Sequence, residues 1–137
     1  DFGKVVFAQF MPHEFRTALE MCRADGSSLH QALRQTVGTD HAVVGAMLVE
    51  KWRFERGLID TISHQYDIEQ LDTDSFACVF AANQISKKLA FGFGGNPYVH
   101  ALPPQIARRL GGSLDELIAS NASLNAAFED AKLFARM

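Results

Sequence analysis

Residues 37–65 decide the fold; they read VGTDHAVVGAMLVEKW (37–52) and then RFERGLIDTISHQ (53–65). Thr39 or Asp40 can cap a helix, over about 40–52, whose apolar residues recur at helical spacing as far as Trp52. A short loop then leads into a second helix that ends near His64. The stretch therefore predicts two successive helices, with His41 opening the first and His64 closing the second.

The remainder of the chain is also predicted to be helical, with caps and breakers between the helices. Further helices are expected from Pro12 to a break at 25–28, over 28–37, from about 73 to 91, over 103–110, from Ser113 onward, and over about 121–136. Residues 4–10 are apolar and β-prone, so strand and helix both stay open there. No convincing strand is found, and one all-α domain over residues 1–137 is predicted.

Composition excludes several classes of function. The chain has 137 residues, is 47% hydrophobic and contains eleven Phe, so it can bury a core. Its net charge of −3 argues against a nucleic-acid partner. The longest apolar runs are far shorter than the roughly 20 residues that span a bilayer. Two cysteines without metal-ligand spacing indicate reduced thiols and favour a cytoplasmic protein.

Asp1, His41 and His64 are candidate metal ligands. Metal-dependent phosphohydrolases bring imidazole and carboxylate ligands together around divalent ions, which orient a phosphate and convert bound water to hydroxide. Facing helices of a bundle can supply such ligands to Mn, Fe, Zn or Mg. The alternative is structural: His41 packs in a first helical turn, and His64 is favoured by the dipole at a helix C-terminus.

The order of motifs resembles the HDOD domain (HD-related output domain) of the HD superfamily. Residues 1–6 look like the continuation of the family's H-D-I-G-K motif, and residues 38–46 resemble its G-x-D-H-x-x-x-G-A segment. Residues 51–52 and 62–65 resemble its K-W and I-x-x-H-H segments, and residues 81–85 lie where the family has A-D-x-I. The resemblance implies an all-α, HD-domain-like helical bundle. It also implies that this chain is the C-terminal part of that domain, with upstream helices absent.

Departures from the family pattern affect its metal site. His64 is followed by Gln65 where the active enzymes often have a second histidine, and Asn83 stands where the family has an aspartate. The first histidine of the H-D pair is also absent from this chain. Asp1, His41 and His64 are thus an incomplete ligand set, and the resemblance implies a degenerate metal site.

Three functions follow as hypotheses. The first is a bacterial signal-transduction module, catalytically degenerate, that acts through protein–protein or interdomain contacts. A metal-dependent phosphohydrolase acting on a phosphoester or cyclic nucleotide is the second, and it would need a divalent metal. A nucleotide-binding regulatory domain without turnover is the third. We expect no cofactor under the first hypothesis, and partners that are other signalling domains or proteins, or a second copy of the chain, without nucleic acid or membrane.

Other residues receive structural interpretations. Gly45 is expected to allow close helix packing, and Asn83 to be a buried hydrogen-bonding residue. Trp52 and Phe54 are expected in a core or an interface. His30 has no partner in the sequence and is expected at the surface or in a loop.

Overall fold

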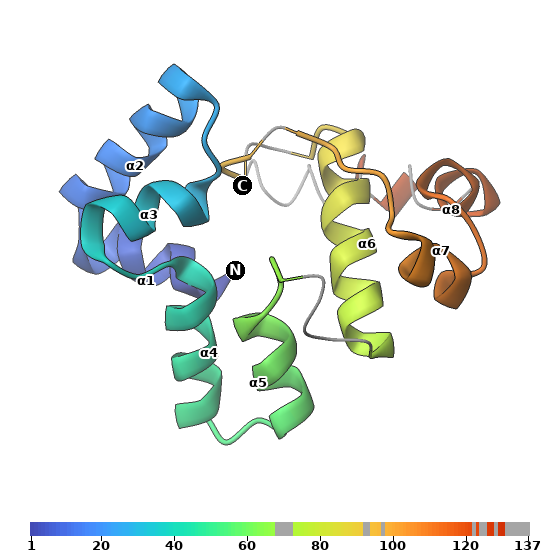
Figure 1. Ribbon diagram of the computed structural model, residues 1–137, viewed down its shortest axis with the longest axis horizontal. Coiled ribbons are helices and arrows are strands. Elements are labelled where there is room, and N and C mark those ends of the chain that lie inside the picture. Colours follow the sequence, from blue (N-terminus) through green and yellow to red (C-terminus); the bar gives the residue numbers. More distant parts are fainter. Residues whose placement is uncertain are drawn as a thin grey trace. The chain divides into compact units, whose positions relative to one another are not determined.

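A computed structural model describes residues 1–67, 73–91, 94–96, 98–121, 123, 126–127 and 129–130 (Figure 1). The helices are α1 (Phe2–Phe10), α2 (Pro12–Asp25), α3 (Leu29–Val37), α4 (His41–Lys51), α5 (Arg56–Ser63), α6 (Asp74–Lys88), α7 (Pro104–Leu110) and α8 (Leu114–Ser120). Strands do not occur in these ranges, so the predicted all-α class is confirmed, and residues 4–10 are helical. None of the helices described has the length and hydropathy of a bilayer-spanning segment.

The chain divides into two compact units. Unit 1 comprises residues 1–76 and 94–96, and unit 2 comprises residues 77–93 and 97–137. The division falls within α6. The expectation of one HDOD-like domain over residues 1–137 stays a prediction.

Local capping chemistry sets the helix boundaries of unit 1. The side chain of Gln31 accepts a hydrogen bond from the backbone N–H of Ser28 (3.2 Å) in the predicted capping box of α3. Gly38 ends α3 with a φ of 77°. Asp40 then caps α4, because its Oδ1 accepts from the backbone N–H groups of Ala42 (2.8 Å) and Val43 (3.1 Å).

The helix predictions for the second half of the chain had different outcomes. α6 ends at Lys88, three residues before the expected 91, and Ala90 follows it with a φ of 53°. The capping box that opens α8 is confirmed, since Ser113 N–H donates to Oε2 of Glu116 at 2.7 Å. The helix expected over 121–136 lies mostly outside the described residues.

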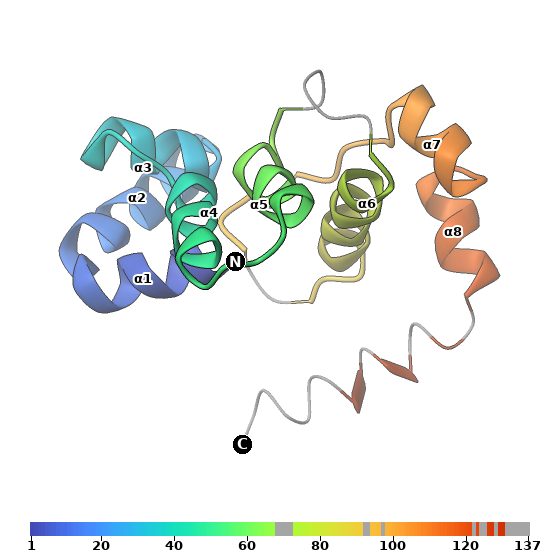
Figure 2. The same ribbon diagram turned by 90° about the horizontal axis from the view of Figure 1, so that it is seen from below.

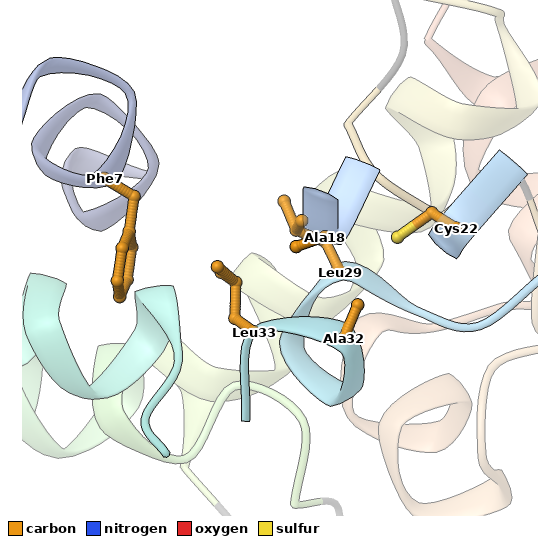
Figure 3. Close-up of a cluster of buried hydrophobic side chains, with 6 residues drawn as sticks. All are labelled: Phe7, Ala18, Cys22, Leu29, Ala32 and Leu33. Atoms are coloured by element: carbon orange, nitrogen blue, oxygen red, sulfur yellow. The ribbon is translucent and has the colours of Figure 1, made fainter. Parts of the chain in front are cut away.

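The core of unit 1 lies between α1, α2 and α3 (Figure 3). Its buried members are Phe7 from α1, Ala18 and Cys22 from α2, and Leu29, Ala32 and Leu33 from α3. Truncating a buried leucine such as Leu33 to alanine removes about 2–5 kcal/mol of stability in proteins generally. This cluster fixes the start of α3, and so it positions the polar residues around it.

α4 packs against both α5 and α1. Ala46 and Val49 of α4 form a second apolar cluster with Ile59 of α5, and Figure 2 shows these two helices side by side. A Cβ placed on Gly45 would lie 3.4 Å from the backbone nitrogen of Gly3. The predicted role of Gly45 in close helix packing is therefore confirmed.

Residues 94–96 return to unit 1 from far along the chain. The carbonyl of Gly95 accepts a hydrogen bond from the backbone N–H of Leu29 (3.0 Å), at the first position of α3. The carbonyl of Gly94 accepts from Nζ of Lys4 (2.8 Å). Gly95 has a φ of 90°, and a Cβ there would come 2.5 Å from Cβ of Leu29, so this position requires glycine.

Candidate functional site

His41 is held inside unit 1 by a tyrosine. It is the first residue of α4 and is only 2% exposed. Its Nε2 lies 2.7 Å from the hydroxyl oxygen of Tyr66, which follows α5 in a turn. The packing of α4 against α5 brings these two residues together, although the sequence between them contains a whole helix and two loops.

Tyr66 also stacks on His30, with ring centroids 4.3 Å apart and an angle of 11° between the planes. Nδ1 of His30 lies 2.9 Å from the hydroxyl of Ser28, the cap residue of α3. His30, Tyr66 and His41 therefore form one connected polar group. The expectation that His30 is a surface or loop residue without partners was wrong, because it lies half-buried in α3 and contacts both Ser28 and Tyr66. Tyr66 is distant in the sequence, so no local signal indicates the stack.

His41 and Tyr66 are uncharged at neutral pH. Burial, together with the positive charge of Lys4, lowers the pKa of His41 to about 3. Burial and the charge of Asp40 raise the pKa of Tyr66. Nδ1 of His41 is buried and has no hydrogen-bond partner among the residues that the structure describes. A neutral imidazole with one partnered nitrogen therefore stands at the start of α4.

A cavity of about 280 Å³ lies beside the group. It is lined by His30, Arg34, Asp40, Ser63, His64, Tyr66 and Asp67. Arg34 reaches Oδ2 of the buried Asp40 through its Nε at 2.6 Å. Burial alone would raise the pKa of Asp40, but the hydrogen bonds from Val43 and Arg34 outweigh it and lower that pKa. The wall is polar and carries both signs of charge.

The other two candidate ligands are engaged in local contacts. His64 is half-buried at the end of α5, and its Nδ1 lies 3.0 Å from the carbonyl oxygen of Asp60 one turn earlier. The exposed Asp1 accepts from Nζ of Lys4 at 2.8 Å. Over the described ranges, no three His, Cys, Asp or Glu side chains are grouped so that they could hold a metal ion.

The residues present therefore do not fit a metal ion without further ligands. A structural zinc site takes four protein ligands and a catalytic one takes three. Within the described part of the chain, one nitrogen of His41 has no hydrogen-bond partner, and neither Asp1 nor His64 joins His41 in a ligand group. The metal-site assignment of Asp1, His41 and His64 stays a prediction.

The buried amide of α6 is not the one expected. Asn83 is half-buried, whereas Gln84 is 2% exposed and its Oε1 accepts from the backbone N–H of His100 at 2.9 Å. Successive side chains on a helix point about 100° apart. Asn83 corresponds to the family aspartate, but its neighbour Gln84 is the side chain that points into the protein. A cavity of about 540 Å³ in unit 2 includes His100 and the ion pair of Lys88 with Asp115. It contains none of the candidate metal ligands.

Comparison with known proteins identifies the class. Residues 1–68 match the HDOD domain family, and this part of the chain therefore belongs to it. The fold resembles the crystal structure of an HDOD domain protein of unknown function from Geobacter sulfurreducens, with 26% sequence identity and a TM-score of 0.75. That match covers 96% of this chain and 49% of the other, so the chain spans about half the length of its structural relative. No curated protein matches.

Proposed function

We propose that this chain is a regulatory HDOD module that acts through contacts with a partner protein or a neighbouring domain, without hydrolysing a phosphoester. The contact between Tyr66 and His41 carries this proposal. Hydrolysis in this superfamily would require imidazole lone pairs directed at a metal ion. Here Nε2 of His41 is engaged by a hydroxyl, and the second imidazole, His64, is engaged by a backbone carbonyl.

The neutral side chain of Asn83 supports the same proposal. The resemblance places a carboxylate there, and an amide oxygen is a much weaker ligand for Mn, Fe or Zn. Two histidines and a terminal aspartate would remain, each with a partner inside the protein. A scaffold of this kind keeps the packing of the fold while its former ligands serve as structural hydrogen-bonding groups.

Metal analysis tests the proposal directly. The purified chain is loaded with Mn, Fe, Zn or Mg, dialysed, and analysed by elemental mass spectrometry, and its hydrolysis of phosphomonoesters, phosphodiesters and cyclic nucleotides is assayed in parallel. We expect substoichiometric metal and no turnover. Stoichiometric metal that is lost in His41→Ala but retained in His13→Ala, an exposed histidine outside the group, would contradict the proposal.

The cavity beside Tyr66 favours a second function, the binding of a phosphorylated small molecule without turnover. Its wall offers a guanidinium (Arg34) and two imidazoles (His30 and His64), which are common phosphate and base contacts. Its volume of about 280 Å³ lies just below the range of about 300–1,000 Å³ for ligand pockets, so part of a nucleotide would fit.

Thermal unfolding distinguishes this function from the first. A ligand that binds only the folded state at 100 times its Kd adds about 2.7 kcal/mol of stability. Nucleotides that raise Tm for the chain, but not for Arg34→Ala, would support a ligand site. Arg56→Ala is the matched control, because Arg56 is also exposed and ion-paired but is not in the cavity wall. If no nucleotide changed the Tm of the chain, nucleotide binding in this cavity would be excluded.

A further inference from the structure

Residues 94–96 form a strap that holds the first turns of two helices in unit 1. The carbonyl of Gly95 accepts a hydrogen bond from the backbone N–H of Leu29 (3.0 Å), the first residue of α3. The carbonyl of Gly94 accepts from Nζ of Lys4 (2.8 Å) in α1. The first N–H groups of a helix have no acceptor within it, so the strap supplies one to α3 from far along the chain. The chain on both sides of the strap belongs to unit 2.

The contact on Leu29 lies one residue from the wall of the cavity beside Tyr66. His30 follows Leu29 directly, and its ring stacks on Tyr66 with centroids 4.3 Å apart. Nδ1 of His30 lies 2.9 Å from the hydroxyl of Ser28, which precedes Leu29. Both rings line the cavity of about 280 Å³. The turn that the strap holds at Leu29 is therefore the turn that presents His30 to Tyr66.

The contact on Lys4 lies near His41, the third member of the polar group. Nζ of Lys4 donates to Oδ2 of Asp1 and to the carbonyl of Gly94, at 2.8 Å in each case. After burial, the charge of Lys4 is the largest cause of the lowered pKa of His41, so the ammonium lies close to the imidazole. Among the described residues, release of Gly94 removes one of the two acceptors that fix this charge in place.

Two glycines make up most of the strap, so its docking is finely balanced. Gly94 and Gly95 have no side chains to bury, and they accept their hydrogen bonds through backbone carbonyl groups. Glycine also loses more conformational freedom on becoming ordered than any other residue. Segments with few buried side chains open locally, whereas core elements open only when the protein unfolds. The strap can therefore be released while Leu29 stays in the apolar cluster.

We propose that the strap is a latch: docking of residues 94–96 orders the rings of His30 and Tyr66 in the cavity wall, and release loosens them. Unit 2 controls the latch, because it continues the chain on both sides. Within unit 2, Oε1 of Gln84 accepts from the backbone N–H of His100 (2.9 Å) and so tethers the chain four residues after the strap. The latch regulates the ligand site of the second function proposed above, and its biological role rests on that function.

Gly95→Ala should release the strap, because a Cβ there would come 2.5 Å from Cβ of Leu29 and the φ of 90° disfavours alanine. In NMR spectra of the full chain, hydrogen exchange of the Leu29 amide should accelerate about tenfold through local opening. The ring signals of Tyr66 should shift toward their values in the unfolded chain. Gly111→Ala is the matched control and should change neither signal, since Gly111 has a φ of 83° in unit 2 and its Cβ would meet no described atom within 4 Å.

A second variant tests control from unit 2. Gln84→Met removes the acceptor of the His100 N–H and leaves every residue of unit 1 unchanged. It should shift the Leu29 and Tyr66 signals in the same direction as the strap variant, by a smaller amount. Ser113→Ala is its control, because it removes the cap of α8, also in unit 2, and should shift neither signal.

Circular dichroism checks that each variant is folded. If Gly95→Ala is unfolded, Lys4→Met removes the donor to the strap and should produce the same two changes. If Gln84→Met is unfolded, His100→Pro removes the donor of the same tether.

Three results would overturn the proposal. The first is a strap variant in which the Leu29 amide exchanges as slowly as in the parent chain. The second is faster exchange at Leu29 with unmoved Tyr66 signals, which would separate the strap from the cavity wall. The third is a Gln84→Met variant that shifts neither signal, or shifts them no more than Ser113→Ala does. No nucleotide or metal is added in these measurements, so the latch can fail while either proposed function stands.

Discussion

Gly3 lies directly against the backbone of His41. A Cβ placed on Gly3 would come 1.9 Å from the carbonyl oxygen of His41 and 2.7 Å from its carbonyl carbon. No side chain is compatible with that approach, since real Cβ contacts are not shorter than about 3 Å. The first turn of α1 and the first turn of α4 are therefore in backbone contact, and this contact positions the only fully buried histidine among the described residues.

Gly3→Ala should destabilise the protein by about 1–3 kcal/mol or more, because the added methyl group forces two helices apart. Urea unfolding followed by circular dichroism measures the change. Gly57→Ala is the matched control: Gly57 is also helical, and a Cβ there meets only the flexible end of Glu55 at 3.4 Å. The control should gain about 0.5–1 kcal/mol from the helix preference of alanine. Equal effects at both sites would refute the backbone contact.

Acidification should destabilise the protein through His41. The pKa of His41 is about 3 in the folded state, mainly through burial and then through Lys4, against about 6.5 when unfolded. Above pH 6.5 both states are neutral at this residue. As pH falls from about 6.5 toward 3, only the unfolded chain takes up the proton, so stability is lost at roughly 1 kcal/mol per pH unit.

The variant His41→Gln isolates this effect from the other titrating groups near it. Lys4, His30, Asp40 and the terminal amine all act on His41, and they remain in the variant. Urea unfolding of both proteins at about pH 7 and about pH 5 gives the two slopes. The slope should be smaller in His41→Gln. Equal slopes would show that His41 does not remain neutral in the folded state.

Tyr66→Phe should cost about 1–3 kcal/mol, because it leaves Nε2 of the buried His41 without its 2.7 Å partner. The free energy of unfolding in urea measures this cost. Tyr98→Phe is the comparison, since Tyr98 is 58% exposed, and its effect should be smaller. A loss at position 98 equal to that at position 66 would contradict the role assigned to the hydroxyl of Tyr66.

Arg53→Gly should stabilise the protein by about 0.5–1 kcal/mol. Arg53 has a φ of 61°, a left-handed conformation that costs a residue with a Cβ about 1–2 kcal/mol and that glycine adopts freely. The opposite exchange, Gly38→Ala, should destabilise the protein, because Gly38 has a φ of 77°. A Cβ at this position would meet no atom within 4 Å, so the effect reports backbone strain without a steric clash. Thermal unfolding of both variants measures the pair, and a stabilising Gly38→Ala would refute the argument.

Helix boundaries could be predicted from the sequence because the chemistry that sets them is local. Ser28 finds its capping partner three residues away, and Asp40 caps the N–H groups of the next turn. Neither contact depends on the rest of the fold. The same reasoning placed the starts of α2, α6 and α7 correctly, since proline, threonine and aspartate act within the first turn.

The polar group around His41 could be predicted only in part. The family motif indicates His41 itself, but the stack of His30 on Tyr66 joins two elements through tertiary packing, which no short spacing encodes. Asn83 is expected to be buried because it is a polar residue on an otherwise apolar helix, but Gln84, one residue further on, is the buried amide, since the sequence does not fix how α6 is rotated against its neighbours. Trp52 and Phe54 were expected in a core or an interface, and the structure leaves about half of each exposed.

The returning segment 94–96 has a consequence for anyone who trims this protein. A fragment that stops at residue 68 contains the complete family match, yet it lacks the carbonyl groups that receive Leu29 and Lys4. The backbone N–H of Leu29, in the first turn of α3, would then lose its acceptor. Because Leu29 is also a buried member of the apolar core, fraying of this turn would weaken the packing of the core. The segment that matches the family model is therefore shorter than the smallest piece that we expect to fold, and expression boundaries should follow the hydrogen bonds of Gly94 and Gly95.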